Sequence, residues 1–96
     1  AEVIDVATLK PLDMDTILAS VARTGRCVIV TEAARTCSFA SEIAANLAEE
    51  GLLTLLAPVQ RVTGYDTVVP LARLEQRYMP SKQRIIAAAK NALAFA

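Results

Sequence analysis

The chain has 96 residues with ten basic and ten acidic side chains, so its formal net charge is zero, and this length suits one domain. It contains no histidine, which excludes Ser-His-Asp and Cys-His nucleophile systems and zinc sites built on imidazole. Three scattered glycines cannot form a phosphate-binding loop, and two cysteines outside a CxxC pair cannot form a disulfide scaffold. Apolar residues make up 54% of the chain, but 18 residues are alanine, so we expect a core of Val, Ile and Leu.

The first predicted element is a strand over residues 2–6, which show an alternating strand pattern. Pro11 keeps the residue before it out of helical geometry, so a helix is expected to begin beyond it, with Asp13 as its N-cap. Gly25 stands where a left-handed residue would end this helix. With the next strand, Cys27–Thr31, these elements would form a right-handed βαβ unit.

The second strand, Cys27–Thr31, is short and rich in β-branched residues, which is typical of a strand buried on both faces of a parallel sheet. A polar loop follows it, and Ser38 is the predicted N-cap of an amphipathic helix that ends near Gly51. In open α/β sheets, ligands and partners are met beyond the carboxyl ends of the strands. We therefore expect function at this edge of the sheet.

A third strand is predicted at Val59–Val62, and a second loop, Thr63–Pro70, follows its carboxyl end. Residues 71–80 are ambiguous, with a helical turn possible over Leu71–Tyr78, whereas a final helix after its cap Ser81 is clear. These elements predict an α/β fold, a three-layer αβα arrangement with a mainly parallel sheet. Because natural domains seldom open in mid-sheet, we expect this single domain, residues 1–96, to be incomplete at its N-terminal edge.

Polar and aromatic residues of the two loops, with the first residue of the second helix, are the candidate interface. They are Glu32, Arg35, Thr36, Phe39, Tyr65 and Asp66.

Each candidate also has a structural interpretation. Glu32 is able to pair locally with Arg35 instead of binding a partner. Cys37 is either a thiol activated near a helix amino terminus or a small turn residue. Asp13 and Asp15 are explained by helix capping rather than by a phospho-acceptor pocket.

The two halves of the chain carry opposite charge. Residues 1–50 hold four basic and eight acidic residues, whereas residues 51–96 hold six and two. Four basic residues of the second half could attract an acidic partner or form a solvated face; they are Arg73, Arg77, Lys82 and Arg84. There is no clustered basic stripe of the kind that binds nucleic acid and no apolar run near the length of a membrane span, about twenty residues.

Several motifs occur together in a known order. The segment Val3–Asp13 resembles the opening of the transketolase-like C-terminal domain. Thr24–Arg26 and Glu32–Thr36 are similar to one branch of that family, the beta subunits of thiamine-diphosphate-dependent 2-oxo acid dehydrogenases. Two later segments continue the match, Ala57–Thr67 and Tyr78–Pro80.

The chain also departs from the family pattern. Thr31 stands where the family often has His, and Cys37–Ala40 replaces a Gly-Gly-Phe-Gly run, which removes backbone freedom there. The loop Gly64–Thr67 is more similar to branched-chain-type subunits than to pyruvate-type ones. Both types remain open.

The resemblance implies an α2β2 enzyme that decarboxylates a 2-oxo acid on thiamine diphosphate and Mg and passes the acyl group to a lipoyl arm of an acyltransferase core. It implies that this chain carries no catalytic, cofactor or metal residue. The chain would instead contact the alpha subunit and a second beta subunit and dock the acyltransferase. In relatives the carboxyl terminus of the beta subunit docks the acyltransferase. The corresponding residues here are Phe95 and Ala96.

Two other functions are considered. One is the C-terminal domain of a transketolase-type or deoxyxylulose-phosphate-synthase-type enzyme, and the other is a free-standing α/β interaction module. The loops after the second and third strands favour the dehydrogenase subunit over the transketolase-type domain. The opening in mid-sheet favours it over the free-standing module. The free cysteines indicate a reducing compartment, either the bacterial cytoplasm or the mitochondrial matrix, and we expect neither nucleic acid nor membrane as a partner.

Overall fold

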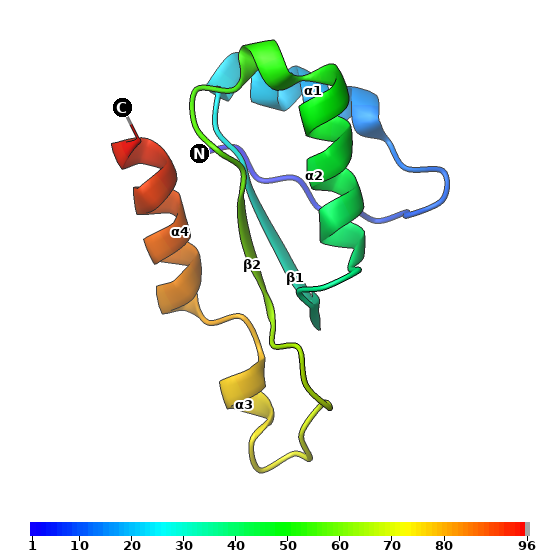
Figure 1. Ribbon diagram of the computed structural model, residues 1–96, viewed down its shortest axis with the longest axis vertical. Helices are drawn as coiled ribbons and strands as arrows, with labels where there is room; N and C mark the ends of the chain where they lie inside the picture. The colour runs from blue at the N-terminus through cyan, green and yellow to red at the C-terminus, as the bar shows by residue number, and fades with distance from the viewer. Residues whose placement is uncertain (96) are drawn as a thin grey trace.

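The computed structural model describes residues 1–95, which form three layers. A two-stranded sheet lies between two helices on one face and the last long helix on the other (Figure 1). The α/β class and the parallel sheet that the sequence predicts are confirmed. The elements in chain order are α1 (Met14–Thr24), β1 (Val28–Ala34), α2 (Phe39–Glu50), the 3-10 helix η1 (Leu52–Thr54), β2 (Gln60–Gly64), α3 (Glu75–Tyr78) and α4 (Lys82–Ala94).

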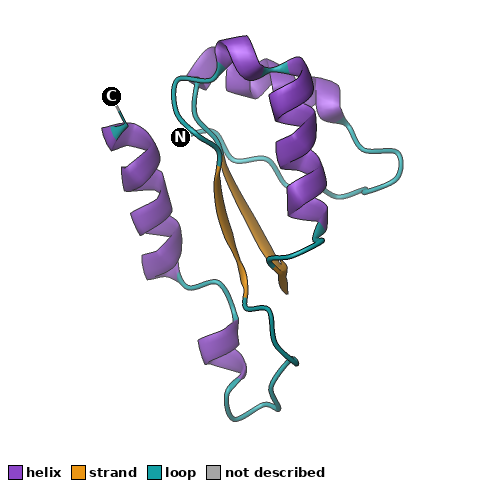
Figure 2. Ribbon diagram, in the orientation of Figure 1, coloured by secondary structure: helices purple, strands orange, loops and turns teal. Residues whose placement is uncertain are grey.

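The sheet is one parallel βαβ unit in which α2 connects β1 to β2 (Figure 2). Val28 pairs with Gln60 and Val30 with Val62, and the register becomes irregular before Ala34 pairs with Gly64. Ile29 contacts the core between α1 and α2, so the alternate residues of β1 face α4.

The main hydrophobic core lies between α1, α2 and the sheet. Ile17 and Val21 from α1 pack with Ile43 and Leu47 from α2, and Leu47 is fully buried. These residues recur at helical spacing, which is why the sequence pattern located both helices. The core is made of branched aliphatic side chains, as the composition predicts.

The caps of α1 agree with the sequence. Asp13 accepts a hydrogen bond from the Thr16 backbone N–H at 3.1 Å. Gly25 ends the helix with a φ of 72°, a left-handed value that favours glycine. A Cβ at Gly25 would also lie 2.6 Å from Leu56 Cδ1, so this turn packs tightly against the segment before β2.

The predicted first strand is wrong. Residues 1–8 have no regular secondary structure, and Val3 is 91% exposed. The alternating pattern is short, and a strand forms only where a neighbouring strand accepts its hydrogen bonds. Glu2 instead pairs with Arg23 of α1, at 2.6 Å. The βαβ unit predicted from residues 2–31 is therefore not formed.

Both strands end later than the sequence indicated. β1 starts after Cys27 and continues to Ala34, so Glu32 belongs to the strand and not to the loop. β2 starts after Val59 and includes Thr63 and Gly64, both predicted as loop. Glu32 extends β1 as an exposed residue, whereas Thr63 extends β2 although it is buried, because its hydroxyl donates to the Gly64 carbonyl at 2.8 Å. Periodicity alone does not show either case.

The carboxyl end of α4 and the carboxyl ends of the two strands lie at opposite ends of the molecule, called its two poles below (Figure 1). α4 runs back along the sheet, so its carboxyl end lies at the end of the molecule opposite the loop 65–74 (Figure 1). Ser81 caps α4 by accepting from the Arg84 N–H at 3.2 Å, as predicted. Within residues 1–95, no helix has both the length and the apolar character needed to span a membrane.

Candidate functional site

The loops after β1 and β2 meet at the carboxyl edge of the sheet. The Thr36 backbone N–H donates to Asp66 Oδ1 at 2.9 Å, and the Thr36 hydroxyl donates to Asp66 Oδ2. These bonds hold the pKa of the Asp66 carboxyl below its usual value, with the Thr36 hydroxyl as the largest cause. Two of the candidate residues, 30 positions apart in the chain, are therefore joined directly.

Two arginines connect the loop after β1 to β2 at the same edge, Arg35 in the loop and Arg61 in the strand. Arg35 Nη1 donates to the Arg61 carbonyl at 3.2 Å, and Arg61 Nη1 donates to the Arg35 carbonyl at 3.2 Å. Arg61 Nη1 also donates to Ser41 Oγ on α2 at 2.8 Å. The sequence analysis did not single out Arg61, although an arginine inside a predicted strand was a signal that its guanidinium needs acceptors.

The local pairing considered for Glu32 and Arg35 is wrong. Among residues 1–95, Arg23 and Glu2 make the single ion pair, and Arg35 binds a β2 carbonyl instead. Glu32 is an exposed β1 residue.

An aromatic cluster supports the second loop. The rings of Tyr65 and Tyr78 meet edge to face, with centroids 6.5 Å apart and an interplanar angle of 69°. The Arg84 guanidinium lies 4.9 Å from the Tyr65 ring centroid, a cation–π contact. Arg84 Nη1 is buried and has no hydrogen-bond partner among residues 1–95, so the ring face is its main electrostatic contact. Arg84 thus packs against Tyr65, and its suggested contact with an acidic partner stays a prediction.

Gly64 allows the strand and this cluster to approach each other. A Cβ at Gly64 would lie 2.5 Å from the Glu32 carbonyl oxygen and 2.6 Å from Tyr78 Cζ. Real Cβ atoms do not reach such distances, so this position requires glycine. The sequence analysis included Gly64 only as part of a family motif, because the partner Tyr78 is distant in the chain.

The remaining candidates of this edge do not join the Thr36–Asp66 contact. Phe39 is half-buried and packs against the core of α1 and α2, which limits what it offers to a partner. Cys37 is exposed with a φ of 57°, a turn residue in left-handed geometry. Ser38 stands at the N-cap of α2 but makes no capping bond; its hydroxyl donates to the Arg35 carbonyl at 3.4 Å.

The carboxyl-terminal candidates lie at the other pole. Phe95 is 51% exposed and follows the end of α4 directly. Ala96 lies outside the described residues. The candidate docking terminus and the candidate interface at the sheet edge are therefore two separate surfaces.

The titratable groups with shifted pKa values do not form a reactive site. Burial raises the pKa of the Cys27 thiol, which keeps it protonated and unreactive. Among residues 1–95 no three carboxylate, thiol or imidazole groups converge as metal ligands.

Fold and site together define a three-layer α/β domain whose polar loops meet at the carboxyl edge of a parallel sheet. Residues 1–85 match the family described as transketolase, C-terminal domain, and the chain belongs to this family. Over 94 residues, 98% of the chain, it is 46% identical to the pyruvate dehydrogenase E1 component subunit beta of Staphylococcus epidermidis. It is 45% identical to the protein of the same name from Staphylococcus aureus over the same length. The chain spans 29% of the length of these relatives.

Proposed function

We propose that this chain is the assembly and docking domain of the beta subunit of a 2-oxo acid dehydrogenase of the pyruvate type. The observation that carries the proposal is the 45–46% identity, along almost the whole chain, to bacterial subunits of that name. In the whole enzyme, an alpha subunit and a second beta subunit complete an α2β2 assembly that uses thiamine diphosphate and Mg. The acyl product passes to the lipoyl arm of an acyltransferase core, in the bacterial cytoplasm.

The loop 65–74 supports an assembly role. It extends from the carboxyl edge of the sheet (Figure 1). Val68 and Leu71 within it are 87% and 88% exposed. Contiguous exposed apolar side chains of this kind mark contact surfaces in soluble proteins. The base of the loop is fixed by the Thr36–Asp66 bonds and by Tyr65 on Tyr78, so its position is defined before any partner binds.

The opposite pole supports docking at the carboxyl terminus. Phe95 lies away from the loop 65–74, so a subunit covering that loop would leave the terminus open to the acyltransferase. The terminal carboxylate of a native end could accept a charge-assisted bond from a partner's arginine. Assembly and docking thus use different surfaces.

The assembly proposal is tested in the full-length beta subunit co-expressed with its alpha subunit. Val68→Asp with Leu71→Asp places two charges on the apolar loop and should abolish α2β2, measured by native mass spectrometry. Val3→Asp, at a fully solvated position of residues 1–8, is the matched control and should assemble normally. A normal heterotetramer from the double variant would contradict the assembly role of this loop.

The docking proposal needs a separate experiment. Removing residues 95–96 from the assembled enzyme should weaken its binding to the isolated subunit-binding domain of the acyltransferase, measured by calorimetry at low and moderate salt. Decarboxylation of free substrate should stay unchanged, because that step does not use the acyltransferase. Equal binding by the shortened enzyme would refute docking at the terminus.

A branched-chain substrate is the second candidate, supported by the sequence of the loop Gly64–Thr67. Decarboxylation of pyruvate and of 3-methyl-2-oxobutanoate by the assembled enzyme distinguishes the two. Preference for pyruvate supports the first proposal, and preference for the branched acid supports the second.

A further inference from the structure

Among residues 1–95, no backbone N–H group caps the carboxyl end of α4. α1 and α2 end on Gly25 and Gly51, whose backbone N–H groups donate to carbonyls of the last turn. α4 ends on Phe95 in extended geometry, with no such bond and no basic residue in its last turn. The last four carbonyls of any helix lack partners within it, and they carry the negative end of the helix dipole.

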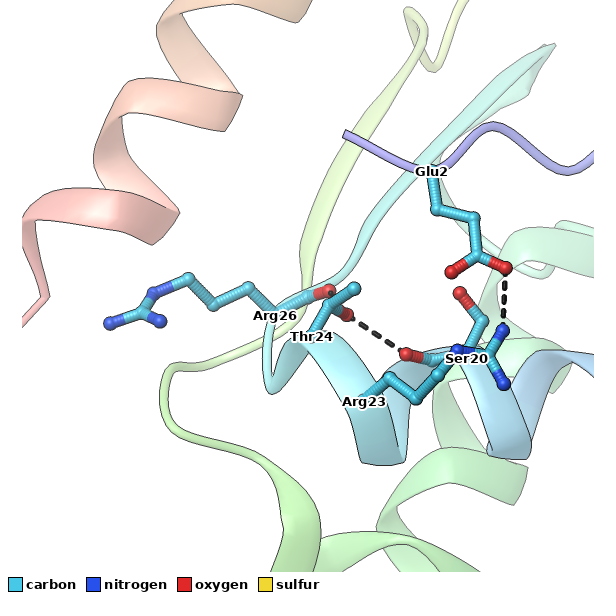
Figure 3. Close-up of polar contacts among 5 residues, drawn as sticks. All are labelled: Glu2, Ser20, Arg23, Thr24 and Arg26. Carbon is cyan, nitrogen blue, oxygen red and sulfur yellow. Dashed lines mark hydrogen bonds and ion pairs between the residues drawn. The ribbon is translucent and has the colours of Figure 1, made fainter.

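Arg26 supplies the missing cap from a position 66 residues earlier in the chain. Its Nε–H donates to the Ala92 carbonyl at 2.8 Å, in a partly buried contact. Figure 3 shows the Arg26 side chain extending towards α4, away from Arg23, which turns to Glu2. A cation at this place satisfies an orphan carbonyl and complements the helix dipole at once.

Apolar packing alone holds the end of α4 weakly. The buried residues of this helix are Ala88 and Ala92, which contribute little apolar area, whereas Leu93 is 69% exposed. The Arg26 bond is therefore a main constraint on the last turn, from which the chain leaves towards its terminus.

We infer that Arg26 is the residue that positions the carboxyl terminus for docking. This inference rests on the proposed docking function. Arg26 holds the last turn of α4 against the amino end of β1 and so sets where Phe95 emerges. An acyltransferase domain then meets a last turn of α4 that is already held in place, and association does not carry the entropy cost of ordering that turn.

The test uses the full-length beta subunit assembled with its alpha subunit. Arg26→Met removes the guanidinium and keeps most of the apolar stem, whereas Arg26→Lys keeps the charge and a donor. Arg23→Met is the matched control, since Arg23 lies three residues earlier and pairs with Glu2 without touching α4. Two quantities are measured: backbone amide exchange along α4, and calorimetric binding of the isolated subunit-binding domain.

Arg26→Met should speed amide exchange over residues 91–95 while leaving residues 85–88 protected, and should weaken docking about tenfold. Arg26→Lys should keep part of the amide protection and part of the docking affinity. Arg23→Met should change neither quantity. Unchanged exchange in Arg26→Met would overturn the capping role, and faster exchange with unchanged affinity would overturn the positioning role. Loss of protection throughout α4 would show that Arg26 supports the whole helix, which also overturns positioning.

The two proposals fail in distinguishable ways. If the wild-type assembly does not bind the subunit-binding domain, the docking function is refuted together with the positioning role. The exchange measurement still decides whether Arg26 caps α4, because it needs no partner.

Discussion

At the scale of single residues, Gly64 leaves the least room for a side chain of the three glycines, because an added Cβ would lie 2.5 Å from the Glu32 carbonyl oxygen and 2.6 Å from Tyr78 Cζ. Gly64→Ala should destabilise the protein by about 1–3 kcal/mol, because either the strand pair or the ring must move. Thermal and urea unfolding of the purified full-length protein measure this change. In a Tyr78→Leu background, Gly64→Ala should destabilise the protein less, because the Tyr78 ring that the new Cβ would meet has been removed. Equal unfolding of Gly64→Ala and wild type would show that this packing is not required.

The Thr36–Asp66 contact has a defined pH dependence. The Asp66 pKa is lower in the folded state than in the unfolded chain, because Thr36 donates to the carboxylate. Its stabilising contribution is therefore present above the unfolded pKa, about 3.9, and is lost as the pH falls through the lowered folded value. The carboxyl carbon shift of Asp66 in an NMR titration reports that folded value. An ordinary titration midpoint, or one unaffected by Thr36→Val, would contradict this account.

At the scale of elements, the helices could be predicted from the sequence, but the hydrogen bonds of their caps could not. Ser81 and Ser38 both precede amphipathic helices and were predicted as caps on equal grounds, yet only Ser81 bonds a helix N–H. Ser38 turns instead to the Arg35 carbonyl of its own loop. The helices themselves could be predicted because their apolar faces recur locally. The side-chain conformation of Ser38 depends on the loop after β1, which is bound to β2 through the Arg35–Arg61 hydrogen bond.

The two serines make a matched prediction. Ser81→Ala should cost about 1 kcal/mol of stability, because it leaves the Arg84 N–H without its acceptor. Ser38→Ala should cost only a few tenths, because no cap bond is lost. Urea unfolding of the two variants compares them directly. Equal costs would mean that Ser38 caps α2 in solution.

Strand pairing was the least predictable part of the fold, and residues 2–6 show why. Their alternating pattern fits a strand, but a strand is defined by a neighbour, and the pattern carries no information about that neighbour. Contacts of the candidate site follow the same rule. Asp66 and Thr36 were singled out by residue type and place, whereas Arg61 and Tyr78 act through partners that only the folded chain brings close.

At the scale of the whole molecule, residues 1–95 leave both outer edges of the two-stranded sheet unpaired. Unpaired strand edges and exposed apolar side chains both favour association with another chain. We therefore expect the 96-residue chain, when produced alone, to self-associate. Sedimentation velocity should show a mean mass that rises with protein concentration, and the melting temperature should rise with it.

The double variant that tests assembly also shows which surface causes self-association, the loop 65–74 or the open strand edges. If the loop 65–74 drives association, Val68→Asp with Leu71→Asp should return the isolated chain to monomer, because two charges oppose burial of that loop. If the open strand edges drive it, the double variant should associate as wild type does. A monodisperse wild-type monomer with a sharp, concentration-independent thermal transition would refute self-association by either route. It would also show that a two-stranded sheet with helices on both faces is sufficient for this chain to fold without a partner.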